Sequence, residues 1–281
     1  MSAVTRPVVR WYGGKWKLAP WIIAHFPPHR VYVEPFGGGG SVLLRKPRTY
    51  AEIYNDLDGE IVNLFRVLRD EVLAARLIEQ LKLTPFAREE MVLARALCDE
   101  PVERARRLVA LCCMGFGSNA HTRVATGFRS CSNRSGTTPA HDWANYPEAL
   151  LATVERMRGV VIEHRDAKAV MSSADEPHTL HYVDPPYVHA TRGRSDRQRG
   201  YMHELSDADH AALLAFLNTL KGMVVLSGYP TELYDSALGD WQRIERKAFA
   251  DGARARTEVL WLNPTCAARL RAKGPLFEAA A

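Results

Sequence analysis

Residues 30–44 read RVYVEPFGGGGSVLL, and this stretch decides the fold. Its first residues are β-branched or aromatic and predict a strand. The strand pattern breaks at Pro35 and at four successive glycines, after which SVLLRK predicts a helix with Ser41 near its N-cap. Residues 49–70 repeat this order, with a strand ending near Asn55-Asp56 and then a helix. That helix places four apolar residues on one face: Ile61, Leu64, Phe65 and Leu68.

Two consecutive strand-loop-helix units predict a parallel sheet with crossover helices. Helical patterns then fill residues 71–115 in EVLAARLIEQLKL, AREEMVLARALCD and PVERARRLVALCCMGF. A loop is expected at 118–140, a helix in YPEALLATVERMRG and strand-like alternation in VVIEHRDAKAVM (160–171). Strand, helix and strands resume in LHYVDPP, DADHAALLAFLNTLKG, MVVLSGY and RTEVLWLNP. We therefore expect an α/β sheet interrupted by a mainly helical segment at roughly 70–155.

The composition places the chain among ordinary folded proteins. The chain has 281 residues, 47% of them hydrophobic, and this is enough to form one large domain or a domain with a sizeable insertion. No apolar stretch approaches the roughly 20 residues that span a membrane, and the N-terminus does not resemble a signal peptide. The cysteines lack C-x-x-C spacing, which favours reduced, mostly buried thiols in a cytoplasmic protein over disulfides or a zinc site: Cys98, Cys112, Cys113, Cys131 and Cys266.

The positive charge is concentrated in two stretches that read as loops. The chain carries a formal charge of +5. Residues 120–140 hold Arg123, Arg129 and Arg134 and no acidic residue, and RGRSDRQR (192–199) holds four arginines and one aspartate. Two solvated loops are the plain interpretation, and contacts to a polyanion are the functional one.

The glycine run lies where an open α/β sheet binds its ligand, beyond the carboxyl end of a strand. It lacks the Lys-Ser/Thr of a P-loop and the G-x-G-x-x-G spacing of a dinucleotide site, so a nucleotide-type cofactor is favoured over a bare phosphate. Asp56 follows the next strand, where a carboxylate can accept from both ribose hydroxyls; the alternative is a helix N-cap for residues 58–69. Asp166, in IEHRDA, is a candidate acceptor for an adenine amino group or a plain cap.

The segment DPPY (184–187), at the end of a predicted strand, is the most specific feature. The prolines fix the backbone and remove two N–H donors, so main-chain carbonyls are left to accept. Asp184 adds a carboxylate acceptor, and Tyr187 adds an aromatic face. This combination suits a planar ring with an exocyclic amino group. Near the N-terminus, RWYGGKWKLAPWI (10–22) places Lys15 after two glycines, like a cation set to face a carboxylate.

Together, DPPY, VEPFGGGGSV and the N-terminal WYGGK resemble the DNA adenine-N6 methyltransferases of the Dam type, also called the D12 class. The resemblance covers nearly the whole chain, including VLSGY and RTEVLWLNP. It implies a Rossmann-like class I methyltransferase fold with a mixed, mostly parallel sheet. Residues 1–70 and 156–281 would form the catalytic domain, and residues 71–155 an inserted, mainly helical target-recognition domain.

The resemblance also implies roles for single residues. The expected F-x-G-x-G loop is Phe36, Gly38 and Gly40, with glycine also at both variable positions, which favours a more mobile loop. Contacts to S-adenosyl-L-methionine are expected from Trp11, Lys15, Glu34, Phe36, Gly38, Gly40, Asp56, Asp166 and Asp184. The catalytic motif is Asp184, Pro185, Pro186 and Tyr187. No metal is required.

The implied reaction is methyl transfer to N6 of a flipped adenine in double-stranded DNA. Candidates for base edges are Arg123, Arg129, Asn133 and Arg134, and candidates for phosphates or the displaced strand are Arg192, Arg194, Arg197 and Arg199. A homodimer would suit a two-fold symmetric site. Two alternatives stay open: another acceptor, RNA adenine or protein glutamine, and a DNA-binding module without catalysis.

Overall fold

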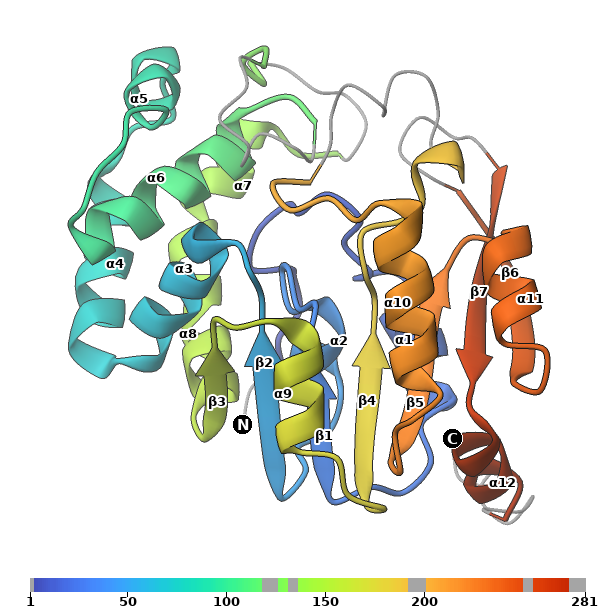
Figure 1. The fold of residues 1–281 in the computed structure, drawn as a ribbon. Coiled ribbons are helices and arrows are strands. Elements are labelled where there is room, and N and C mark those ends of the chain that lie inside the picture. The colour runs from blue at the N-terminus through green and yellow to red at the C-terminus, as the bar shows by residue number, and fades with distance from the viewer. Residues whose placement is uncertain (1–2, 118–125, 131–135, 192–200, 250–254, 273–281) are drawn as a thin grey trace. The chain divides into compact units, whose positions relative to one another are not determined.

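The computed structural model describes residues 3–117, 126–130, 136–191, 201–249 and 255–272 (Figure 1). The chain divides into two compact units. The first contains Met1–Lys17, Gly38–Arg45 and Asp56–His164, and the second contains Leu18–Gly37, Lys46–Asn55 and Arg165–Ala281. Arg123, Asn133, Arg134, Arg192, Arg194, Arg197 and Arg199, all candidates for DNA contacts, lie outside the described residues.

A seven-stranded sheet forms the framework of the fold, and six of its strands belong to the second unit in the order β2-β1-β4-β5-β7-β6. Among these, β2, β1, β4 and β5 run parallel, whereas β7 is antiparallel to both β5 and β6. The mixed, mostly parallel sheet is thereby confirmed. The six strands are β1 (Val31–Glu34), β2 (Ala51–Asn55), β4 (Thr179–Val183), β5 (Met223–Gly228), β6 (Gln242–Phe249) and β7 (Ala255–Leu262). The seventh, β3 (Val160–Glu163), lies in the first unit.

Helices of the second unit cover both faces of its strands (Figure 1). One face packs Val33, Val183 and Leu226 against α9 (Ala167–Ser173), α10 (Asp207–Leu217) and α11 (Glu232–Ala237). The other face carries Tyr32 and Tyr182, which contact Phe26 just after α1 (Ala19–Ala24). Side chains alternate between the faces because a strand repeats every two residues. The C-terminal helix of the unit is α12 (Pro264–Ala272), and a 3-10 turn, η2, spans His189–Thr191.

The first unit is mainly helical. Its central helix, α3 (Gly59–Arg69), contacts α4 (Glu71–Leu83), α6 (Pro101–Met114) and α8 (Tyr146–Met157). The four apolar residues assigned to one face of α3 are fully buried, as the 3.6-residue period requires: Ile61, Leu64, Phe65 and Leu68. The remaining helices are α2 (Ser41–Arg45), α5 (Arg88–Leu93) and α7 (Pro139–Ala144).

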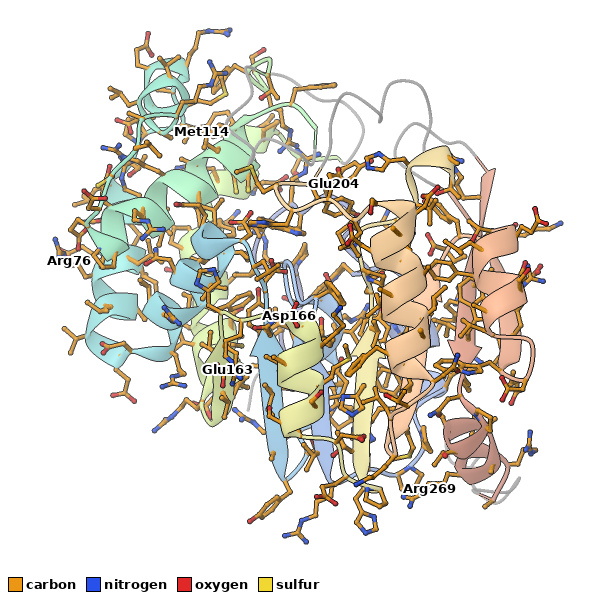
Figure 2. The ribbon with its side chains drawn as sticks, in the orientation of Figure 1. Arg76, Met114, Glu163, Asp166, Glu204 and Arg269 are labelled. Carbon is orange, nitrogen blue, oxygen red and sulfur yellow. The ribbon has the colours of Figure 1, made fainter. Side chains whose placement is uncertain are left out.

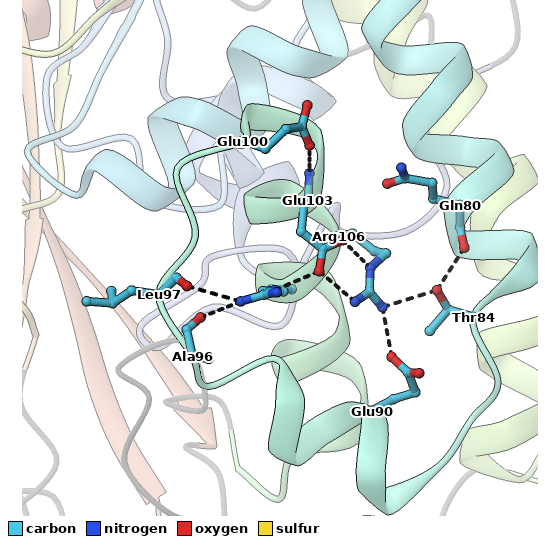
Figure 3. Close-up of polar contacts among 9 residues, drawn as sticks. Gln80, Thr84, Glu90, Ala96, Leu97, Glu100, Glu103 and Arg106 are labelled. Atoms are coloured by element: carbon cyan, nitrogen blue, oxygen red, sulfur yellow. Dashed lines mark hydrogen bonds and ion pairs between the residues drawn. The ribbon is translucent and has the colours of Figure 1, made fainter.

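A charged network ties α5 to α6 in this unit (Figure 3). The Arg106 guanidinium donates to both carboxylate oxygens of Glu103, at 2.6 and 2.8 Å, and to Glu90 at 2.9 Å. Arg107 donates to Glu103 as well, at 2.6 Å. Hydrogen bonds from Arg106, ahead of those from Arg107, lower the pKa of Glu103 to about 2, so Glu103 stays ionised over the physiological range.

Two sequence predictions need correction. The strand-like alternation predicted over 160–171 ends at Glu163, and α9 begins at Ala167 because the Asp166 side chain accepts from the Ala169 N–H at 3.0 Å. The loop predicted over 118–140 ends earlier, since α7 begins at Pro139. Thr138 caps α7, with proline in its first turn.

The described residues add three observations on the composition. None of their helices is long and apolar enough to cross a membrane. They contain no group of three or more His, Cys, Asp or Glu side chains arranged to hold a metal ion. Cys112 and Cys266 are buried thiols, and Cys98 and Cys113 are half-buried thiols, whereas Cys131 lies outside the described residues.

Candidate active site

In the first unit, the glycine loop is held to Asp56. The Gly38 N–H donates to Asp56 Oδ2 at 2.7 Å, and the Asp58 N–H donates to Asp56 Oδ1 at 2.8 Å. A carboxylate accepts at about four positions, and these two bonds use one position on each oxygen. The cap of α3 is Asp58, whose side chain accepts from the Glu60 N–H. The alternative of Asp56 as the helix cap is therefore wrong.

Gly38 requires the absence of a side chain. Its φ of +46° lies in the left-handed region, and a Cβ there would meet Trp11 Nε1 at 2.6 Å and Cδ1 at 2.7 Å. The indole of Trp11 thus lies directly against the loop backbone. Gly40 has a φ of +62°, and a Cβ on it would meet the buried Phe65 ring at 3.1 Å. Two of the predicted loop glycines therefore allow close packing of backbone on aromatic rings.

The N-terminal segment forms a tight turn that holds Lys15. The Gly14 N–H donates to the Trp11 carbonyl at 3.1 Å, and Gly13 has a φ of +72°. Lys15 is only 5% exposed, and its ammonium donates to the Gly13 carbonyl at 2.9 Å. The structure therefore brings Trp11, Gly38 and Asp56 together, with Lys15 buried in the turn that carries Trp11. That Lys15 faces a carboxylate stays a prediction.

In the second unit, Asn55 connects the loops that follow the strands. Its side-chain amide donates to the Pro35 carbonyl at 2.9 Å and to the Arg165 carbonyl at 3.0 Å. Its amide oxygen accepts from the Arg165 N–H at 2.9 Å. Asn55 thereby orients both the start of the glycine loop and the residue before Asp166. The sequence placed Asn55 only at a strand end, and these tertiary contacts leave no local signal.

The other predicted cofactor residues of this unit have defined surroundings. Glu34 is buried and accepts from the Tyr32 hydroxyl at 2.6 Å. Phe36 is half-buried against the apolar core of the sheet. Asp166 lies at the N-terminus of α9 (Figure 2), where its Oδ1 caps the helix. Their contacts to a cofactor stay predictions.

The predicted catalytic motif follows β4 directly, since the strand ends at Val183. Tyr187 is 8% exposed, and its hydroxyl donates to Glu258 Oε2 at 3.0 Å and lies 3.2 Å from Ser227 Oγ. Its ring meets Tyr229 edge-on, with the centroids 4.5 Å apart. Burial, followed by the charges of Glu258 and Asp184, raises the pKa of Tyr187 well above its ordinary value, so the phenol stays protonated.

Polar side chains cross the second unit near this motif on one face of the sheet. Glu34, Tyr182 and Ser227 come from β1, β4 and β5, and Glu258 comes from β7. All four are buried. Burial, followed by the charges of Asp184 and Glu34, raises the pKa of Tyr182 well above its ordinary value. The partners of Tyr187 on β5 and β7 were not anticipated. The one available signal was a glutamate beside the apolar run VLWL.

Arg129 is the one predicted DNA-contacting residue that the described part of the chain includes. Its Nη1 donates to the Cys113 carbonyl at 2.9 Å, and its N–H donates to the Met114 carbonyl at 2.8 Å. Burial, and then the nearby Arg10 charge, lower the pKa of its guanidinium. The contacts place Arg129 against the C-terminal end of α6, and its role toward a base stays a prediction.

Three DNA adenine methylases resemble this chain in sequence. It is 27% identical over 193 residues to the DNA adenine methylase of Salmonella typhimurium, covering 65% of each chain. It is 27% identical to that of Haemophilus influenzae, covering 65% of this chain and 64% of the relative, and 38% identical over 68 residues to that of Vibrio cholerae, covering 24% of each. It thus spans less than two thirds of the length of the first two relatives.

The match to a family extends further along the chain. Residues 11–251 match the family model described as D12 class N6 adenine-specific DNA methyltransferase. That range contains the Trp11 turn, the glycine loop, Asp56 and the DPPY segment at the end of β4. This chain belongs to the family of D12 class N6 adenine-specific DNA methyltransferases.

Proposed function

We propose that this protein transfers a methyl group from S-adenosyl-L-methionine to N6 of adenine at specific sites in double-stranded DNA. The observation that carries the proposal is the placement of Asp184-Pro185-Pro186-Tyr187 directly after β4, with the Tyr187 hydroxyl anchored in the core. Membership of the D12 family and the relatives named DNA adenine methylase support the same activity.

The residues of the first unit fit the cofactor. Gly38 and Gly40 have positive φ, and the Trp11 and Phe65 rings fill the space that a Cβ would need, so the loop backbone packs closely against aromatic rings. We place the ligand against this backbone, beside Trp11. Asp56 presents a carboxylate fixed by two backbone donors, which suits the two hydroxyls of a ribose. We assign Trp11, Lys15, Gly38, Gly40 and Asp56 to binding S-adenosyl-L-methionine, which when bound supplies a methyl group on a positively charged sulfur.

Asp184 and the Pro185 carbonyl act on the target amino group. The adenine amino nitrogen is a weak nucleophile because its lone pair is delocalised into the ring. Two acceptors that bind its two hydrogens draw the nitrogen towards tetrahedral geometry and expose the lone pair. Positioning of this kind supplies much of the rate acceleration. The nitrogen lone pair forms the new N–C bond as the methyl–sulfur bond breaks, the sulfur keeps the electron pair of that bond, and the nitrogen then releases one proton to solvent. We propose neither a covalent enzyme intermediate nor a metal.

The target base must leave the duplex to reach these groups, at a cost of a few kcal/mol. Stacking on Tyr187 returns about 1–3 kcal/mol of that cost. We propose that residues 71–155 recognise the site, with Arg123, Arg129, Asn133 and Arg134 as candidates for base edges. Arg192, Arg194, Arg197 and Arg199 would hold phosphates, so affinity should fall steeply with salt.

Asp184→Ala tests the assignment. We expect it to abolish methyl transfer from labelled cofactor, because Asp184 accepts a hydrogen bond from the amino group of the target adenine. Cofactor binding should stay measurable by calorimetry. Asp240→Ala, which removes an exposed carboxylate of the same unit, is the matched control and should keep full activity. Full activity in Asp184→Ala would overturn the catalytic role of the motif.

The acceptor class needs its own assay. Duplex DNA, single-stranded DNA, RNA and a protein glutamine substrate are compared in parallel with the wild-type protein. We expect duplex DNA to be preferred. A preference for RNA or glutamine would overturn duplex DNA as the proposed substrate. If none of the four substrates is methylated, a DNA-binding module without catalysis would be favoured.

A further inference from the structure

We infer that Glu258 on β7 and Ser227 on β5 are positioning residues, which hold the Tyr187 ring in the orientation that receives the target base. The inference rests on the proposed function, because it assigns a purpose to contacts of Tyr187 that matter only if a base stacks there. Neither residue belongs to the DPPY segment or to the glycine loop.

The hydrogen-bond directions around the phenol are determined by its single proton. Tyr187 donates that proton to Glu258 Oε2 at 3.0 Å. The Ser227 hydroxyl, 3.2 Å away, therefore donates to the phenol oxygen. The bond to the carboxylate is the stronger kind, since an ionised acceptor roughly doubles the strength of a hydrogen bond.

Three contacts from different segments then restrict the ring. The hydroxyl end is held from β7 and β5, and the ring packs at a steep angle against Tyr229, which follows β5. At the other end, the backbone enters through Pro185 and Pro186, whose φ angles are fixed. A tyrosine fixed at both ends cannot rotate to meet a base in several ways, so its stacking face is set in advance.

Glu258 lies where a carboxylate is costly. It is 7% exposed, and the residues after it in the strand, Val259 to Leu262, are almost fully buried. A buried carboxylate destabilises a fold unless donors satisfy it. The Tyr187 hydroxyl is such a donor. A phenylalanine with an apolar partner would fill this place at lower cost, so a role in orienting Tyr187 explains the pair better than packing does.

The test is a double-mutant cycle with Glu258→Gln and Tyr187→Phe. The glutamine is isosteric and still accepts, but without charge. We expect Glu258→Gln to lower kcat on duplex DNA by about 10-fold. In the Tyr187→Phe background the same change should lower kcat less than about twofold, because the hydroxyl through which Glu258 acts is gone.

Two further measurements separate positioning from a merely structural role. The affinity for S-adenosyl-L-methionine should stay unchanged, and a DNA with 2-aminopurine at the target position should show a changed fluorescence on binding Glu258→Gln, since the flipped base is stacked less well.

Glu52→Gln is the matched control. It removes a buried carboxylate of β2 that pairs with Lys46 at 2.6 Å, so it should lower the melting temperature and leave kcat unchanged.

Ser227→Ala provides a second variant that keeps the fold. We expect a smaller loss of kcat, again absent in the Tyr187→Phe background. The positioning role would be overturned if Glu258→Gln lowered kcat equally in the wild-type and Tyr187→Phe backgrounds, or did not lower it at all. The proposed function would still stand in that case, provided that the wild-type protein methylates DNA. A wild-type protein that methylates no DNA adenine would instead overturn the proposed function, and this inference with it.

Discussion

Gly38→Ala tests whether the Trp11–Gly38 contact belongs to the cofactor site. Two costs follow from the structure. A left-handed φ of +46° costs an alanine roughly 1–2 kcal/mol, of which about 0.4–1 kcal/mol is returned by the reduced entropy of the unfolded chain. The net loss of about 1 kcal/mol should lower the melting temperature by about 2–4 °C.

The second cost falls on Trp11. A Cβ at 2.6 Å from Nε1 must displace the indole by about 0.8 Å to reach an ordinary contact of 3.4 Å. Trp11 is half-buried, so the ring can move without disrupting the core. The hydrogen bond from the Gly38 N–H to Asp56 Oδ2 can survive, because it uses no side chain at position 38. We therefore expect the affinity for S-adenosyl-L-methionine to fall by about tenfold or more, since displacements of about 1 Å have costs of that order.

Calorimetric titration with the cofactor and thermal unfolding measure the two effects separately. Gly239→Ala is the matched control, because its Cβ would meet nothing within 4 Å and its φ is not positive. It should leave affinity unchanged. A Gly38→Ala protein that melts earlier but binds the cofactor within twofold of the wild type would refute the placement of Trp11 and Gly38 in the cofactor site.

Three further predictions concern stability. Gly40→Ala should destabilise the fold more than Gly38→Ala, as measured by denaturant titration, because its Cβ meets Phe65, which is fully buried and cannot yield. Burial lowers the pKa of His181 to about 4, below the ordinary 6.5. The free energy of unfolding should therefore fall by at most about 3 kcal/mol as the pH drops from 6.5 towards 4. Thermal melts of His181→Leu should show a weaker dependence on pH. Glu103→Gln should cost about 1–3 kcal/mol, because it removes the negative charge in Figure 3 and turns one of the two oxygens that accept from Arg106 into a donor. Glu155→Gln, at an exposed ion pair, should cost under about 1 kcal/mol.

Local patterns in the sequence were sufficient to predict the elements around the glycine loop. Residues 31–34, 41–45, 51–55 and 59–69 show the strand or helix period of the elements that they form, and the glycine loop or acidic residues separate each strand from the helix that follows it. The exact cap of α3 was not predictable, because Asp56 and Asp58 both satisfy the preference for aspartate at a helix start. Only the three-dimensional path of the loop shows that Asp58 caps the helix and Asp56 accepts from Gly38.

The partners of Tyr187 could not be predicted for a different reason. Ser227 and Glu258 are 40 and 71 residues from Tyr187 in sequence. They meet it because β7 returns antiparallel beside β5, with Ser227 paired to Leu260. A register shifted by one residue would turn Glu258 to the opposite face. Strand order and register arise from the packing of the whole sheet, and no short pattern in the sequence specifies them.

The two faces of β1, β4, β5 and β7 differ in polarity near the Asp184 end of β4. The face under α9, α10 and α11 is apolar, with Val33, Val183 and Leu226 packed together. The opposite face carries Glu34, Tyr182 and Ser227, each of which is next in sequence to one of these apolar residues. Buried polar groups are costly without partners, so their gathering on one face at one end indicates function in addition to folding. Packing on the apolar face fixes the strands, and the polar side chains on the opposite face can then hold Tyr187 in one orientation.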